Sequence, residues 1–101
     1  MVTCYLRYVI DPLKLKEFEI YAKIWMPLVK KFGGEHHGYF MPHEGANNIA
    51  YALFSFSSLA AYETYRNKVS DDPECQAAMR YYEETKCFIS YERSFMRPVF
   101  E

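Results

Sequence analysis

The segment GGEHHGYFMPHEGANNIAYALFSF, residues 33–56, decides the fold of this 101-residue chain. Its last part, Ile49 to Phe56, would be apolar on both faces of a β-strand, which is typical of a strand in the centre of a sheet. Its first part, Glu35 to Met41, also has strand character, and the glycine and asparagines of Pro42 to Asn48 join the two. The segment therefore predicts two antiparallel strands connected by a long hairpin loop.

The residues before this segment predict a strand and a helix. Val2 to Ile10 mixes β-branched and aromatic residues, and Asp11-Pro12 ends the run. Apolar residues then recur three and four positions apart, which indicates an amphipathic helix that Gly33-Gly34 ends. The apolar positions are Leu15, Phe18, Ala22, Trp25, Val29 and Phe32.

The residues after the segment predict two helices and a last strand. Ser57 or Ser58 can cap a helix over Leu59 to Val69. Asp72-Pro73-Glu74 begins another, with aspartate as the cap and proline in the first turn. Cys87 to Phe95 is the fourth strand.

This order of elements predicts an α+β fold, the ferredoxin-like split βαβ sandwich with a four-stranded antiparallel sheet. Right-handed crossovers place both helical connections on the same face of the sheet. At 101 residues the chain is long enough for one core, so residues 1–101 are expected to form a single domain.

Four stretches carry a resemblance to a known family: TCYLRYVIDPLKLKEFEIYAKIWMPLV, GGEHHGYFMPHEGANNIAYALFSFSSLAAYETYR, DPECQAAM and YERSFMRP. Together they resemble a single-domain bacterial member of the NIPSNAP family, within the dimeric α/β-barrel superfamily. The resemblance implies a homodimer. The superfamily also contains haem-degrading enzymes, which place an iron-binding histidine on a helix, and this chain has no histidine on any predicted helix. We therefore expect no cofactor.

The pattern of the third strand also favours a homodimer. Ile49, Tyr51 and Leu53 form one apolar row, and a second row stands opposite it, yet helices cover only one face. A bare apolar face of this size is expected to pack against a second copy. We expect Phe54 and Phe56 at that interface.

Composition excludes several partners and locations. Twelve basic and thirteen acidic residues give a net charge of −1 without a run of either sign, which excludes a nucleic-acid partner and a charged membrane surface. No apolar stretch reaches the length of a membrane span. Cys4, Cys75 and Cys87 lack CxxC spacing and a leader is absent, so we expect free thiols in a cytoplasmic protein.

All three histidines lie close together in the sequence, which raises the question of a metal site. His36 and His37 are neighbours on a predicted strand and so point to opposite faces, while His43 is six residues beyond His37, roughly 20 Å along an extended strand. Three side chains in that arrangement do not converge on one ion. We therefore predict no metal site.

A pocket between the sheet and the helices is the candidate ligand site. If catalysis occurs there, His37 is the candidate general base, with His36 as the less favoured choice, and Tyr8, Trp25, His37 and Tyr39 are the candidate ligand-binding residues. Strict strand alternation places His37 on the same face as Tyr39. The competing interpretation is that Trp25 and the histidine are core residues without a catalytic role.

A charge in the middle of the first strand needs a partner. Arg7 lies in the centre of that strand, and Glu92 of the neighbouring fourth strand is the expected partner in an ion pair.

Two functions from different classes follow. The first is a homodimeric binding or accessory protein for a small hydrophobic or aromatic molecule. The second is a cofactor-independent monooxygenase or isomerase that acts on a small aromatic or polyketide-like substrate. The sequence leaves open whether the chain is an enzyme. A pocket of several hundred cubic ångströms with a histidine at its wall would favour the enzyme.

Overall fold

A computed structural model describes residues 1–100 of the chain as four strands and three helices. The predicted elements are confirmed, and the fourth strand begins one residue later than expected. In chain order the elements are β1 (Val2–Ile10), α1 (Leu15–Lys31), β2 (Glu35–Phe40), β3 (Ile49–Phe56), α2 (Leu59–Val69), α3 (Pro73–Thr85) and β4 (Phe88–Met96).

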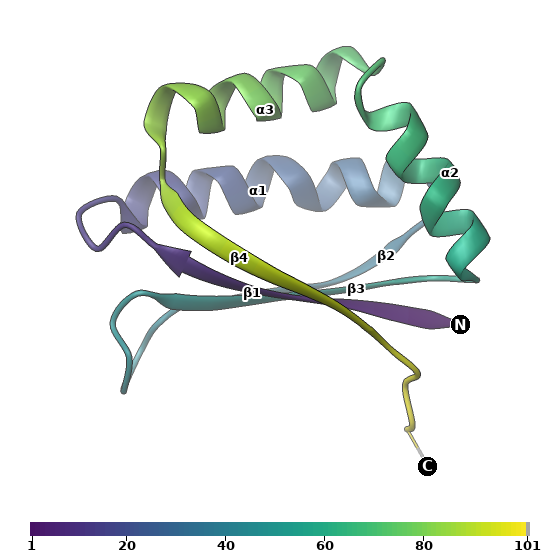
Figure 1. Ribbon diagram of the computed structural model, residues 1–101, viewed down its shortest axis with the longest axis horizontal. Coiled ribbons are helices and arrows are strands. Elements are labelled where there is room, and N and C mark those ends of the chain that lie inside the picture. Colours follow the sequence, from purple (N-terminus) through teal and green to yellow (C-terminus); the bar gives the residue numbers. More distant parts are fainter. Residues whose placement is uncertain (101) are drawn as a thin grey trace.

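The strands form one antiparallel sheet in the order β2-β3-β1-β4. This order, with a helical crossover after β1 and another after β3, is the predicted ferredoxin-like arrangement. All three helices lie on one face of the sheet, while the opposite face has no helix over it (Figure 1).

Helix α1 packs its apolar stripe on the sheet as the spacing predicts. Phe18 and Val29 are buried, and Trp25 packs against the core from a partly buried position. The helix ends where Gly33 takes a φ of 91°, which only glycine adopts without strain. Gly34 is glycine for a different reason, because a Cβ there would lie 2.6 Å from Cγ1 of Val29.

Side-chain caps begin the other two helices, as predicted. The hydroxyl of Ser58 accepts a hydrogen bond from the backbone N–H of Ala61 at 3.1 Å. The carboxylate of Asp72 accepts one from the N–H of Cys75 at 3.0 Å. Lys31 at the end of α1 also binds Asp72, at 2.7 Å, and so connects the end of α1 to the start of α3.

The core lies between the helices and the row of β3 that begins at Ala50. Ala50, Ala52, Phe54 and Phe56 are all buried on this side. The prediction that Phe54 and Phe56 lie at a subunit interface is therefore wrong. Both rings pack against Tyr65 of α2, with centroid distances of 6.5 and 5.2 Å, because this row is the one that α2 covers.

The opposite face of the sheet, hereafter the bare face, carries exposed apolar side chains. Tyr5 and Tyr51 lie side by side on it with ring centroids 5.7 Å apart. Tyr51 is 37% exposed, and Phe40, its neighbour on β2, is 53% exposed. The predicted ion pair between Arg7 and Glu92 is confirmed on this face at 3.8 Å.

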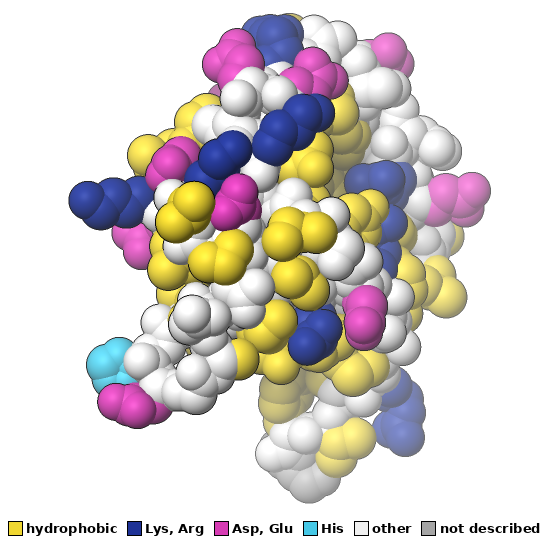
Figure 2. Space-filling model, turned by 60° about the vertical axis from the view of Figure 1, so that its left-hand side comes forward, with side chains coloured by type: hydrophobic (Ala, Val, Ile, Leu, Met, Phe, Trp, Pro, Cys, Tyr) yellow, Lys and Arg dark blue, Asp and Glu magenta, His cyan; other side chains and the backbone are white. Residues whose placement is uncertain are grey.

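Charged and apolar side chains are unevenly spread over the surface. Figure 2 shows charged groups concentrated over the helices, with hydrophobic side chains exposed between them and the projecting loop that joins β2 to β3. Within residues 1–100, no helix has the length and apolar character that crossing a membrane requires.

Candidate functional site

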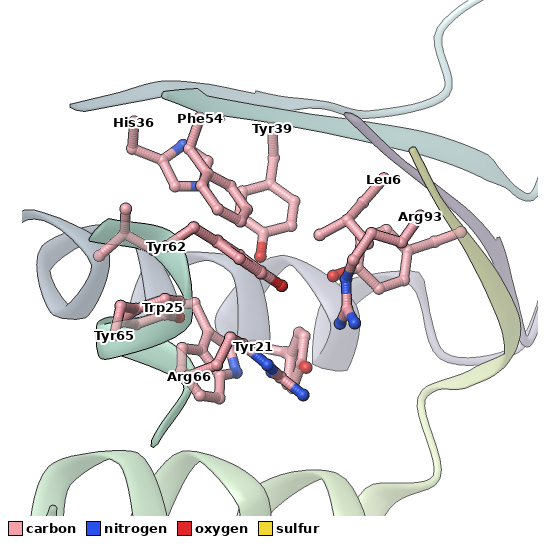
Figure 3. Close-up of a pocket in the computed structure, with 12 residues that line it drawn as sticks. Leu6, Tyr21, Trp25, His36, Tyr39, Phe54, Tyr62, Tyr65, Arg66 and Arg93 are labelled. Atoms are coloured by element: carbon pink, nitrogen blue, oxygen red, sulfur yellow. The ribbon is translucent and has the colours of Figure 1, made fainter. Parts of the chain in front are cut away.

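An aromatic cavity lies between the sheet and the helices, and every layer of the fold contributes to its wall (Figure 3). Its volume is about 60 Å³, room for a few water molecules, because the rings around it fill most of the space. Ligand sites for drug-sized molecules are usually several hundred Å³. The rings that line it are those of Tyr8, Tyr21, Trp25, His36, Tyr39, Phe54, Tyr62 and Tyr65.

A β-bulge in β2 decides which histidine reaches this cavity. His36 pairs with Phe54 and Gly38 pairs with Leu53, so His37 is an extra residue with no partner of its own on β3. Gly38 takes a φ of 112°, which is open to glycine and strained for other residues. The strand therefore loses its strict alternation at this point.

The bulge makes the predicted placement of His37 beside Tyr39 wrong. His36 and Tyr39 both lie on the helix side, where their rings stack with centroids 5.1 Å apart. His37 is exposed on the bare face, where its Nε2 lies 2.8 Å from the hydroxyl of Ser55. The structure thus brings together Tyr8, Trp25, Tyr39 and the less favoured histidine.

The hydrogen bonding of His36 fixes what the ring can offer. Its Nδ1 accepts a hydrogen bond from the backbone N–H of Gly38 at 2.9 Å. Burial, with a smaller contribution from the neighbouring His37, lowers the pKa of His36 to about 4. The ring is therefore neutral at pH 7 and its proton is on Nε2. That N–H is buried and has no hydrogen-bond partner within residues 1–100.

Trp25 presents a second buried donor of the same kind. Its indole N–H has no hydrogen-bond partner among the described residues, and the ring lines the same cavity. An indole nitrogen can donate a hydrogen bond but cannot accept one. The Tyr21 hydroxyl is the nearby acceptor, since the indole lowers the pKa of that phenol against the larger effect of burial, but the two groups do not reach hydrogen-bond geometry. Two N–H groups without a formed hydrogen bond therefore belong to the wall of one small cavity.

Tyr8 and Tyr39 are neighbours in the wall. Tyr8 is 5% exposed, and its ring stacks on that of Tyr39 with centroids 6.1 Å apart. Burial raises the pKa of both phenols well above the usual value. Both hydroxyls therefore keep their protons at neutral pH.

Two arginines that the sequence analysis overlooked complete the wall. Arg66 of α2 and Arg93 of β4 both line the cavity, and in the view of Figure 3 their guanidinium groups lie between these two elements. Neither has a carboxylate within 4 Å in the described part of the chain. The guanidinium of Arg93 lies 5.2 Å from the ring centroid of Tyr91, which is a cation–π distance.

The sequence held a signal for Arg93. On β4 it alternates with the exposed Glu92, and it stands opposite Leu6 of β1, a buried residue on the helix side of the sheet. A cation at a helix-facing strand position is costly unless something binds it or water reaches it.

The histidines do not form a metal site in the described part of the chain. His43 is exposed on the loop after β2, and His36 and His37 lie on opposite faces of the sheet. Within residues 1–100 no three histidine, cysteine, aspartate or glutamate side chains lie close enough to hold one ion.

The three cysteines lie in the core as free thiols. All are buried, as their apolar neighbours in the sequence predict. Burial raises the pKa of Cys4 and of Cys75 to about 11, and also raises that of Cys87. A thiol in this state is a poor nucleophile at neutral pH.

Comparison with known proteins gives a family match and a set of similar folds. The family model NIPSNAP matches residues 5–100. The crystal structure of protein Atu4242 from Agrobacterium tumefaciens is 20% identical, with a TM-score of 0.84 over 99% of this chain and 95% of that one. An uncharacterised NIPSNAP domain protein from Burkholderia xenovorans is 17% identical, with a TM-score of 0.79 over 99% and 96%.

A more distant structure shares the fold alone. It is a putative antibiotic biosynthesis monooxygenase from Nitrosomonas europaea, 4% identical, with a TM-score of 0.75 over 99% of this chain and all of that one. No curated protein matches the sequence.

Proposed function

The chain belongs to the NIPSNAP family, and we propose that it is a homodimeric member that binds a small molecule in the aromatic cavity. The observation that carries this proposal is the pair of buried N–H donors on His36 and Trp25. Leaving a buried donor unsatisfied costs roughly 1–3 kcal/mol. A ligand that accepts hydrogen bonds from both donors would recover that cost.

Ordinary core packing explains the same wall less well. The helix-facing side of the sheet already has a well-packed core at Ile10 and Phe18, both fully buried and free of polar atoms. A packing role at Trp25 or His36 would be filled by apolar rings without two unpaired donors. The polar atoms are therefore better explained by recognition than by stability.

The geometry supports binding over an oxygenase or isomerase. A general base works best when its pKa is near the working pH. His37, the expected base, lies on the bare face, and the pKa of about 4 makes His36 a weak base. The likeness to a putative monooxygenase is one of fold, which does not carry an activity with it.

The homodimer is proposed from the bare face. Tyr5, Leu53 and Tyr51 form adjacent rows on β1 and β3 without a helix over them. A second copy of the same sheet can cover this face through a two-fold axis, which makes the contact self-complementary. Burial of roughly 2,000 Å² in total would make such a dimer obligate.

Light scattering of the purified protein tests the dimer. We expect a mass about twice the chain's 12.0 kDa at micromolar concentration. Leu53→Glu should lower that mass, because it places a charge in the centre of the bare face. Leu59→Glu on α2 is the matched control and should remain a dimer, since Leu59 is 59% exposed on the helical side. A wild-type mass of one chain would refute the dimer.

Mass spectrometry of the protein under native conditions tests ligand binding. We expect the purified protein to retain a small organic molecule from the cells. After unfolding and refolding to remove that molecule, the protein should bind an added small aromatic compound. Tyr39→Trp should reduce either signal, because a larger ring fills the cavity. Leu59→Trp, at an exposed position of α2 outside the cavity wall, is the control. Unchanged binding in Tyr39→Trp would place the ligand elsewhere.

We also propose a cytoplasmic location. The support is the cysteine chemistry, since three free thiols without disulfide bonds are typical of a reducing compartment.

A further inference from the structure

We propose that the ligand of the aromatic cavity is a small planar organic anion, an aromatic carboxylate in the simplest case. This inference rests on the proposed binding function and adds the chemical class of the ligand. It follows from two features of the cavity: its two buried nitrogens without partners are both hydrogen-bond donors, and its two charged groups are both positive.

The two buried side-chain nitrogens of the wall without a partner are both donors, whereas the tyrosine hydroxyls around them can donate or accept. The Nδ1 of His36 is occupied by the N–H of Gly38, so the free nitrogen is Nε2 with its proton. The indole of Trp25 can only donate. A ligand that satisfies both must bring acceptors, and a carboxylate brings two oxygens with about four acceptor positions.

Two cations stand at the open side of the same cavity. Arg66 and Arg93 come from separate elements, α2 and β4, and no carboxylate of residues 1–100 pairs with either one. Both side chains are exposed, in contrast to the buried rings of Tyr8 and Tyr65 behind them. Arginine is well suited to an anion because its planar fork binds a carboxylate with two parallel hydrogen bonds.

The positive charge of both arginines reaches the cavity wall. Burial raises the pKa of Tyr62 and of Cys4, and the charges of Arg93 and Arg66 both oppose that rise at each of the two groups. The two guanidinium groups therefore act on the same region. A carboxylate placed there would be stabilised by both charges, whereas a cation would be repelled.

The shape of the cavity restricts the remainder of the ligand. The tyrosine, histidine and phenylalanine rings leave about 60 Å³, so a bound molecule must be small and flat or must displace side chains at the open edge. Rings stacked like those of His36 and Tyr39 accept a further planar ring in the same way.

The test uses the fluorescence of Trp25, the only tryptophan of the chain and part of the cavity wall. Three probes of nearly equal shape are titrated: benzoate with a negative charge, benzamide with none, and benzamidine with a positive charge. We expect benzoate to bind about tenfold or more tightly than benzamide, which is the usual gain from hydrogen bonds to charged groups. Benzamidine should bind least.

Variants then assign the preference to the two arginines. Arg93→Gln and Arg66→Gln should each reduce benzoate affinity about tenfold and leave benzamide affinity within about twofold. Arg80→Gln, at an exposed position of α3 away from the cavity, is the matched control and should bind like the wild type.

The outcomes separate this inference from the binding function beneath it. Equal binding of benzoate and benzamide would overturn the anion inference and leave a binding cavity in place. Equal losses in Arg80→Gln and Arg93→Gln would also overturn it, because the effect would then come from net charge alone. No response to any probe would overturn both.

Discussion

Replacing His36 with asparagine should reduce the loss of folding stability that the protein shows at acidic pH. The pKa of His36 is about 4 in the folded chain and 6.5 in the unfolded chain, because burial disfavours the charged ring. Below pH 6.5 the unfolded chain takes up a proton that the folded chain does not. Stability is therefore fully present above pH 6.5 and is lost as the pH falls toward 4.

The size of this stability loss follows from the difference between the two pKa values of His36. A pKa of 6.5 in the unfolded chain and of about 4 in the folded chain corresponds to at most about 3.4 kcal/mol of unfolding free energy, at 1.36 kcal/mol per pH unit. The ring is only partly buried, so solvent screening reduces this to about 2 kcal/mol. Asparagine does not titrate, and its side-chain oxygen can take the place of Nδ1 as acceptor for the N–H of Gly38.

Urea unfolding between pH 7.5 and 4 measures the effect, with wild type and variants at the same protein concentration. Wild type should lose about 2 kcal/mol more than His36→Asn over this range, whereas His43→Asn on the exposed loop should follow the wild type. Parallel profiles for wild type and His36→Asn would refute the burial of this ring beneath the helices.

Three further predictions concern the core. Phe18→Ala should lower the free energy of unfolding by about 3–5 kcal/mol, because its ring is fully buried, while Leu13→Ala, at a position 91% exposed, should change it by less than about 0.5 kcal/mol in the same urea titration. Gly34→Ala should lower the free energy of unfolding by about 1–3 kcal/mol in that assay, since the added Cβ would overlap the side chain of Val29 on α1. An unchanged free energy of unfolding would contradict the close packing at Gly34. A thiol reagent at pH 7.5 should label no cysteine until urea unfolds the chain, because burial raises the pKa of all three thiols; rapid labelling of the folded protein would refute this for Cys4, Cys75 and Cys87.

Periodicity was sufficient to predict the fold. The apolar row of β3 that begins at Ala50 and the spacing of Phe18, Trp25 and Val29 on α1 reflect burial directly, because one face of each element must leave water. The pairing of Arg7 with Glu92 was predictable for a related reason, since a charge in the middle of a strand needs a neighbour of opposite sign.

The candidate site was predicted only in part, because one residue changes the strand alternation. Strict alternation assigned His37 to the cavity, and the bulge at that residue exchanges the two histidines. Gly38 was the signal, since an isolated glycine inside a strand often marks a bulge. Arg66 and Arg93 were missed because their significance depends on a tertiary arrangement that brings α2 and β4 to the same cavity.

The measurement that tests the cavity as a ligand site most directly is the nitrogen–proton NMR spectrum of the ¹⁵N-labelled protein. The single tryptophan gives one indole signal, which reports on the buried N–H of Trp25. Addition of benzoate or benzamide should move this signal progressively to a saturating position, while the backbone signal of His43 on the exposed loop remains in place. An indole signal that neither compound moves at millimolar concentration would contradict ligand binding in the aromatic cavity.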